Sequence, residues 1–220
     1  PERLFAAVFH SLDRKVCNTL NVFCVTRDAA PALIPVFLAA LDAAAARRGH
    51  GVKLHVVEGD EAVLPAEWRA ARVQVSRAEG LRDEAKVDIL PQADLGREWE
   101  WEETPELTLK LVDDLDQAIS LFNHYSPQFC ASLISEDAEA QARFYASLNA
   151  PFVGDGFTRW VDGQYALNKP ELGLSNWEFG RLFARGGVLA GDGVFTVRAR
   201  VRQSDIHLDR GGAPTPARRA

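Results

Sequence analysis

Hydrophobic residues recur along the chain in two alternating patterns, one typical of helices and the other typical of buried strands. Apolar residues at helical spacing predict one helix over residues 4–12 and another over residues 31–48. Short runs of β-branched and aromatic residues predict strands at residues 20–25 and 52–57. A strand, a helix and a second strand in close succession indicate a right-handed parallel crossover.

The pattern is weaker in the middle of the chain. Residues 60–70 predict a short helix despite Pro65, and residues 72–75 predict a short strand. Residues 81–95 give a mixed signal, in which only residues 87–90 suit a strand. A second, less regular unit of helix and strand is therefore expected here.

The alternation becomes regular again after this segment and predicts the fold class. The expected elements are strands at residues 107–112, 130–135 and 151–153, and helices at residues 113–123 and 136–148, both opened by acidic residues. Together with the first crossover they predict an α/β fold with an open, mostly parallel sheet covered by helices.

The last third of the chain contains a long loop and a different kind of strand. Residues 154–175 are polar and punctuated by glycine, as in loops that bind ligands. Residues 194–201 alternate between apolar and polar, which predicts a half-exposed strand. We therefore expect a catalytic domain over residues 1–187, including the loop, followed by a C-terminal strand and flexible tail over residues 188–220.

Composition narrows the class of protein. The 220 residues have a net charge of −6, and 47% of them are hydrophobic, which favours neither disorder nor nucleic-acid binding. No apolar run approaches the ~18 residues of a membrane span, so no membrane partner is expected. Three cysteines and five scattered histidines lack the spacing of a disulfide framework or a metal site. These features predict a cytoplasmic protein without a bound metal.

The beginning of the sequence also carries information. The chain has no methionine and starts at Pro1, directly before a predicted helix. Because a native chain normally begins with methionine, we expect this sequence to be part of a longer protein. A further domain is then expected before Pro1.

One cysteine is a candidate nucleophile. Cys17 lies in a polar turn between the first predicted helix and the first predicted strand, next to Arg14 and Lys15. Backbone N–H groups and nearby cations favour a thiolate, which is the reactive form of cysteine. The alternative is that Cys17 is a small buried hydrophobic residue, as we expect for Cys24 and Cys130.

Several motifs carry a resemblance to a known family. Lys15-Val-Cys-Asn-Thr-Leu20 resembles the Ser-Val-Cys-Asn-Ala-Leu motif around the nucleophile of the gamma-glutamyl phosphate reductases, which belong to the aldehyde dehydrogenase superfamily. Residues 109–119 resemble a longer family segment without a gap. Residues 158–163, 171–175 and 181–186 resemble the family's Thr-Arg-Phe-Thr-Asp-Gly, Glu-Ile-Gly-Ile-Ser and Lys-Leu-His-Ala-Arg-Gly motifs.

The resemblance implies an activity and a set of site residues. Cys17 would attack an acyl phosphate, with Asn18 and backbone N–H groups stabilising the oxyanion, and NADPH from the preceding domain would reduce the thioester to an aldehyde. The C-terminal strand would join subunits into a homodimer or a larger oligomer. The resemblance assigns the following residues to substrate binding: Arg159, Asp162, Gly163, Glu171 and Ser175. For Arg159 the alternative is a salt bridge to Asp162 that shapes the loop.

The acidic and aromatic segment at residues 98–106 has two interpretations. It is typical of a solvated loop or edge strand. The resemblance instead implies that one glutamate here orients the nicotinamide ribose of the cofactor. Glu102 is our candidate for this role, and Glu100 and Glu103 are the alternatives because the alignment with the family is uncertain by one or two residues.

Departures from the family motifs leave the substrate open. Phe129 and Phe183 replace two family histidines, and residues 155–157 and 167–169 replace the family's Asn-Ala-Ser and Gly-Leu-Gly. Because these changes remove hydrogen-bonding groups, the alternatives are an aldehyde dehydrogenase of other substrate range or a non-catalytic interaction module.

The predicted topology also places the long loop relative to the nucleophile. We expect Arg159 and Glu171 to fold over Cys17 at the carboxyl edge of the sheet, where open α/β sheets bind ligands.

Overall fold

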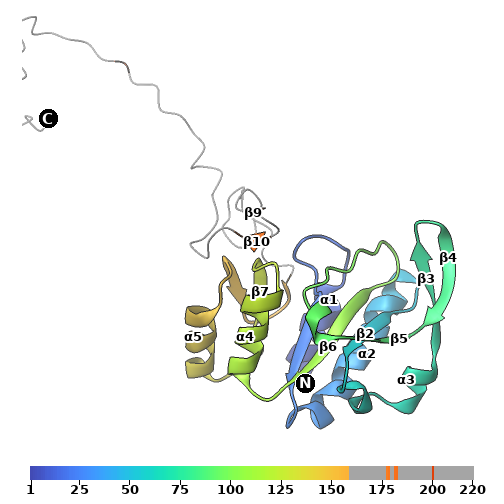
Figure 1. Ribbon diagram of the computed structural model, residues 1–220, viewed down its shortest axis with the longest axis horizontal. Coiled ribbons are helices and arrows are strands. Elements are labelled where there is room, and N and C mark those ends of the chain that lie inside the picture. Colours follow the sequence, from blue (N-terminus) through green and yellow to red (C-terminus); the bar gives the residue numbers. More distant parts are fainter. Residues whose placement is uncertain (159–176, 179–180, 183–199, 201–220) are drawn as a thin grey trace, which may run out of the picture.

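The computed structural model describes residues 1–158, 177–178, 181–182 and 200 (Figure 1). The predicted strand at residues 194–201 lies outside the described residues except for Arg200, and the predicted tail at 211–220 lies outside them entirely. All five predicted substrate-binding residues also lie outside the described residues, so their assignment stays a prediction. They are Arg159, Asp162, Gly163, Glu171 and Ser175.

Helices and strands alternate through the described part of the chain. The first half contains α1 (Glu2–Ser11), β1 (Val22–Thr26), α2 (Ala30–Arg48), β2 (Lys53–Val57), η1 (Glu61–Val63), α3 (Ala66–Ala70), β3 (Arg72–Arg77), β4 (Gly80–Ala85) and β5 (Val87–Leu90). The second half contains η2 (Gln92–Asp94), β6 (Glu106–Val112), α4 (Leu115–Tyr125), β7 (Cys130–Ser132), α5 (Ala138–Ser147), β8 (Phe152–Gly154), β9 (Trp177–Glu178) and β10 (Arg181–Leu182).

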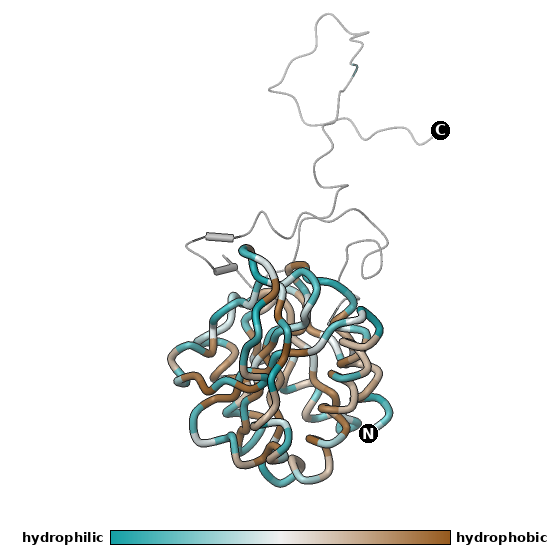
Figure 2. Tube along the Cα trace, turned by 90° about the vertical axis from the view of Figure 1, so that its right-hand side faces the viewer, coloured by the Kyte–Doolittle hydropathy of each residue, from teal (hydrophilic) through white to brown (hydrophobic). Residues whose placement is uncertain are grey.

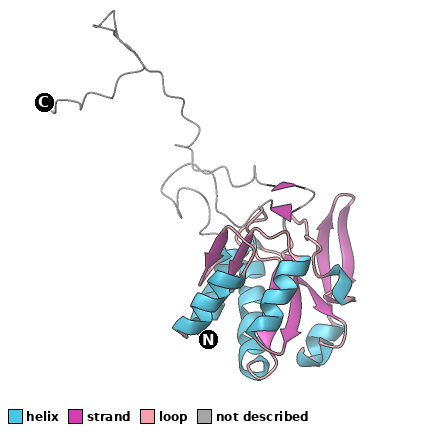
Figure 3. Ribbon diagram, turned by 60° about the vertical axis from the view of Figure 1, so that its left-hand side comes forward, coloured by secondary structure: helices cyan, strands magenta, loops and turns pink. Residues whose placement is uncertain are grey.

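The central sheet has four parallel strands in the order β1-β6-β2-β5. β7 and β8 form a separate parallel pair, and β3 and β4 form an antiparallel hairpin. Figures 1 and 3 show this hairpin at the side of the sheet, away from α4 and α5. The predicted α/β class and mostly parallel sheet are confirmed, and the first crossover joins two strands of the same sheet with β6 between them.

One face of the central sheet is apolar and is covered by α1 and α2. Phe23 of β1 stacks on Phe37 of α2, with ring centroids 4.2 Å apart. By length and hydropathy, α2 would also suit a membrane span. Its side chains Phe37, Ala40, Leu41 and Ala44 have no exposed surface, however, as in the core helix of a globular domain. Figure 2 shows hydrophobic stretches of the trace running through the described body between hydrophilic turns.

The opposite face of the sheet is polar and still largely buried. The register pairs Lys53 with Glu106 and His55 with Thr108, so these four side chains share one face. All four are buried, with at most 5% of each residue exposed. This inner polar face was not predicted from the sequence.

Candidate active site

Cys17 lies at the tip of a short turn that a neighbouring side chain braces. The N–H of Thr19 donates to the carbonyl of Val16 at 3.0 Å, which places Cys17 and Asn18 at the two central positions. The hydroxyl of Thr19 accepts from the N–H of Val16 at 2.8 Å and donates to the carbonyl of Arg14 at 2.7 Å. Cys17 is exposed and Asn18 is buried. The turn therefore presents the thiol to solvent on a fixed backbone.

The other two cysteines differ from Cys17 in their surroundings. Cys24 lies on β1 and Cys130 begins β7, and both are partly buried. Burial raises the pKa of the Cys24 thiol to about 12, and it raises the pKa of Cys130 to about 12 as well, with a smaller contribution from nearby Cys17. Both are therefore protonated at neutral pH, as expected for core cysteines.

The turn that carries Cys17 lies at the amino edge of the sheet. It leads directly into β1, and Asn21 at its end accepts from the N–H of Trp99 at 2.9 Å and donates to the carbonyl of Arg97 at 2.8 Å. The prediction that Cys17 lies at the carboxyl edge of the sheet is therefore wrong. The rule for that edge applies to loops that leave parallel strands, whereas this turn enters one.

The acidic and aromatic segment is a loop that packs against the Cys17 turn. Trp99 and Trp101 are buried, while the glutamates between and beside them are exposed. The ammonium group of Lys15 lies 3.0 Å from Oε1 of Glu98 and 3.9 Å from Oε1 of Glu100. Since Lys15 is two residues from Cys17, these two carboxylates lie beside the turn that carries Cys17. The two carboxylates therefore offset much of the positive charge through which Lys15 would favour the thiolate of Cys17.

The remaining glutamates of this loop make contacts elsewhere. The guanidinium of Arg48 donates to the backbone carbonyls of Glu102 and Glu103. The carboxylate of Glu103 also lies 3.4 Å from Nε2 of His50. The described contacts therefore bring Glu98 and Glu100 to the Cys17 turn, and they place Glu102 against the end of α2.

The start of the long loop also reaches the beginning of the Cys17 turn. Asp155 forms an ion pair with Arg3 at 2.6 Å, and the N–H of Thr158 donates to the hydroxyl of Ser11 at 2.8 Å. The carbonyl of Ser11 accepts from the N–H of Leu20 at 3.2 Å, so Ser11 contacts both segments. The loop thus enters the region beside Cys17 at Thr158, and Arg159 and the residues after it lie outside the described part.

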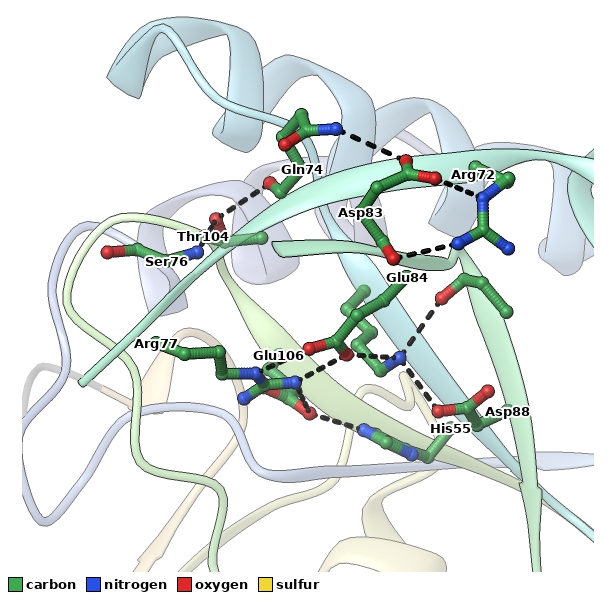
Figure 4. A network of polar contacts seen from close by, with 12 residues as sticks. His55, Arg72, Gln74, Ser76, Arg77, Asp83, Glu84, Asp88, Thr104 and Glu106 are labelled. Atoms are coloured by element: carbon green, nitrogen blue, oxygen red, sulfur yellow. Dashed lines mark hydrogen bonds and ion pairs between the residues drawn. The ribbon is translucent and has the colours of Figure 1, made fainter. Parts of the chain in front are cut away.

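A network of charged side chains lies on the polar face of the sheet, with Lys53, His55 and Glu106 buried at its centre (Figure 4). Nε2 of His55 is 2.6 Å from Glu106, and Arg77 bridges Glu106 and Glu84 at 2.8 Å to each. Lys53 lies 2.8 Å from Glu84 and 2.7 Å from Asp88. Six ionisable side chains from β2, β3, β4, β5 and β6 are thereby connected, which joins the hairpin to the sheet. They are His55, Glu106, Arg77, Glu84, Lys53 and Asp88.

The network holds its acids in the charged form. Burial alone would raise the pKa of Glu106, but hydrogen bonds from His55 and Arg77 outweigh it and lower that pKa. The hydrogen bond from Arg77, with a second from Lys53, lowers the pKa of Glu84 to about 2. Burial likewise opposes the charge of Lys53, yet Asp88 and Glu84 raise its pKa. The sequence offered one signal for this network, namely charged residues inside runs predicted as buried strands.

These features define the class of the domain, and a comparison with solved structures gives a particular relative. The mostly parallel sheet with its covering helices is an α/β domain. The chain is similar to the crystal structure of gamma-glutamyl phosphate reductase from Thermotoga maritima, with a TM-score of 0.56 and 19% sequence identity. The match covers 74% of this chain and 33% of that one, so this chain spans about a third of its relative's length. The predicted resemblance is confirmed for the fold. No family model matches the sequence.

Proposed function

We propose that this chain is the cysteine-bearing part of a reductase that converts an acyl phosphate, such as gamma-glutamyl phosphate, to its semialdehyde, as in proline biosynthesis. The observation that carries the proposal is the exposed thiol of Cys17 at the tip of a braced turn in this fold. The other two thiols are unsuited to attack because their raised pKa keeps them protonated. The proposed localisation is the cytoplasm.

The proposed reaction begins at the sulfur of Cys17. The thiolate attacks the acyl carbon, the bond from that carbon to the phosphate oxygen breaks, and phosphate leaves with the electron pair. Backbone N–H groups of the turn and the side chain of Asn18 would stabilise the oxyanion that forms during attack. After reduction of the thioester, the hemithioacetal loses its proton and collapses, which releases the aldehyde and restores the thiolate.

The residues beside the turn fit one end of a nicotinamide cofactor. Exposed carboxylates accept hydrogen bonds from ribose hydroxyls, and Glu98 and Glu100 carry such groups next to Lys15. We propose Glu100 for this role rather than Glu102, because the backbone of Glu102 is held against Arg48. Bound NADPH would supply the hydride for the reduction. The greater part of the cofactor would be held by a further domain.

The long loop completes the proposed site. Thr158 lies against Ser11 at the start of the Cys17 turn, which supports a role for the residues that follow it. We propose that Arg159 binds the anionic substrate with its guanidinium fork, or braces the loop through Asp162. Gly163, Glu171 and Ser175 belong to the same proposed site. Assembly into a homodimer or larger oligomer through the C-terminal strand is part of the proposal.

The test is detection of an acyl group on Cys17. The protein carrying this chain is mixed with glutamate-5-semialdehyde and NADP⁺ in the absence of phosphate, or with gamma-glutamyl phosphate generated in place in the absence of NADPH, and is analysed by mass spectrometry of its peptides. We expect an acyl adduct on the Cys17 peptide, which Cys17→Ala removes and Cys24→Ala retains. Acylation by other aldehydes alone would indicate an aldehyde dehydrogenase of different substrate range. Absence of any adduct would indicate a non-catalytic module.

A further inference from the structure

A polar cavity of about 590 Å³ opens over the buried charge network. It is bounded by β2, β5, β6, the hairpin and the loop that contains Trp99. Lys53, His55 and Glu106 line it and are each at least 95% buried. A volume of this size is that of a site for a small molecule.

The charge that lines the cavity is predominantly negative. Its carboxylates outnumber its lysines and arginines by six to three. Lys53 and Arg77 are ion-paired inside the network, and Lys15 reaches Glu98 and Glu100 from outside the cavity. This leaves about two negative charges without a compensating cation, and such an excess attracts positively charged ligands. The carboxylates are Glu84, Asp88, Asp94, Glu98, Glu100 and Glu106.

A second, independent feature is the free ring nitrogen of His55. Nε2 of this ring is bound by Glu106, and the ring stacks on Trp99 with centroids 3.5 Å apart. No other described residue hydrogen-bonds Nδ1 of His55. In the described part of the chain, the buried side-chain N and O atoms without a partner are Oγ of Ser132 and Oγ1 of Thr158. Nδ1 is not among them and therefore touches open space, which beside His55 is this cavity.

The ring nitrogen has a defined chemistry in this setting. Glu106 is held as a carboxylate, so it accepts a hydrogen from Nε2 of His55. In the uncharged form of the ring, Nε2 carries the hydrogen donated to Glu106, and Nδ1 presents its lone pair to the cavity as a hydrogen-bond acceptor. An acceptor beside uncompensated carboxylates suits a ligand that is both cationic and a hydrogen-bond donor.

We propose that this cavity binds a small organic cation through a primary ammonium group. Nδ1 of His55 accepts one hydrogen bond from the ammonium, and Asp94 and Glu100 supply negative charge at the exposed side. A metal ion is a poorer match, since the described residues contain no group of three His, Cys, Asp or Glu side chains placed to hold one. This proposal shares Glu100 with the proposed cofactor site, but it does not require the chemistry at the thiol of Cys17.

The test is a calorimetric titration of the full chain with 1,4-diaminobutane at low ionic strength. We expect saturable binding that added salt weakens, and no binding of the uncharged analogue 1,4-butanediol. Glu100→Gln and Asp94→Asn should each weaken binding about three- to tenfold, because each removes one charge from the cavity. His55→Phe keeps the aromatic stack and should weaken binding by about tenfold or more, provided that circular dichroism shows a folded chain.

The matched control is Glu79→Gln, which removes an exposed carboxylate outside the cavity. Unchanged affinity in this variant supports the proposal. Absence of saturable binding would overturn it, as would equal weakening by Glu79→Gln and Glu100→Gln, since that would mean a general attraction to an acidic protein. Because Glu100 is 78% exposed, its variant tests the site even if His55→Phe does not fold.

Discussion

Lys15 and Glu98 form an ion pair of 3.0 Å although 83 residues separate them in the sequence. Lys15 belongs to the turn that presents Cys17, and Glu98 belongs to the loop that enters β6. The side chain of Lys15 is 9% exposed and that of Glu98 is 47% exposed, so solvent and salt still screen the pair from one side. It fixes the position of two segments whose residues are proposed to act together.

The ion pair should tune the reactivity of Cys17. Lys15→Ala leaves the two carboxylates without their cation, which disfavours a nearby thiolate, and alkylation of Cys17 by iodoacetamide should slow by about two- to fivefold. Glu98→Gln should accelerate it by a similar factor. Arg82→Ala, on the exposed hairpin, serves as the control. Changes of the same sign in both variants would contradict this electrostatic coupling.

The three thiols should react at very different rates. Because burial raises the pKa of Cys24 and Cys130 to about 12, less than about one in a thousand of either is a thiolate at pH 8. Exposed Cys17 should be alkylated roughly a hundredfold faster, measured by mass spectrometry of the labelled peptides. Labelling of Cys24 and Cys130 should rise about tenfold per pH unit up to pH 11. Equal labelling of all three thiols at pH 8 would contradict the assignment of Cys17 as nucleophile.

The buried network should matter far more to stability than an exposed pair on the same hairpin. Glu106→Ala leaves Arg77 and His55 facing a buried gap, and it should lower the free energy of unfolding by about 3–5 kcal/mol. Arg72→Ala breaks an exposed pair with Asp83 and should cost less than about 1 kcal/mol. Urea denaturation measures both. Similar costs in the two variants would show that the network is not a significant source of stability.

Acid should lower the free energy of unfolding, because Glu84 becomes protonated. Its pKa is lowered from 4.5 to about 2 in the folded protein, so between these values the unfolded chain binds more protons than the folded one. The stabilisation is therefore complete above about pH 4.5 and is lost as the pH falls through about 2. Glu84→Gln should flatten this part of the stability curve, measured by thermal unfolding across the pH range. Glu79→Gln should leave its slope unchanged.

Local sequence patterns predicted most of the helices and strands because each pattern is set by neighbouring residues. The helix over Ala30–Arg48 and the strand over Lys53–Val57 were both predicted to within one residue, because each is a distinct run rich in apolar residues. β4 was missed because its residues are mostly exposed and therefore show no apolar alternation. β4 is stabilised by its pairing with β3. The residue pattern of one strand does not reveal such pairing with another strand.

The candidate site was predictable only in part, because it depends on contacts between distant segments. Cys17 was proposed from its local turn chemistry together with the resemblance of its motif, and the structure places it in the expected turn. The edge of the sheet on which it lies follows from the direction of β1, which corrected the expected placement. The approach of Glu98 to Lys15 and the pairing of His55 with Glu106 depend on strand register across about 50 or more residues. Sequence periodicity carries no information on such pairs.

The loop beside Cys17 is also held in place by a glycine. A Cβ atom on Gly96 would lie 2.2 Å from the backbone carbonyl oxygen of Tyr125 at the end of α4. Because that oxygen belongs to backbone, it cannot move aside without shifting the helix end. Gly96→Ala should therefore cost about 1–3 kcal/mol of stability and displace the adjoining residues, including Glu98. Gly156→Ala, where nothing lies within 4 Å of the new atom, is the matched control.

Two measurements on Gly96→Ala would separate its local effect from general destabilisation. Thermal unfolding reports the stability cost, and the rate of Cys17 alkylation reports the position of Glu98 beside Lys15. We expect a lower melting temperature together with a changed alkylation rate at 25 °C, where the variant is still folded. An alkylation rate identical to that of the parent chain, despite lower stability, would show that the loop before β6 does not control the nucleophile. The proposed roles of Glu98 and Glu100 beside Cys17 would then have to be abandoned.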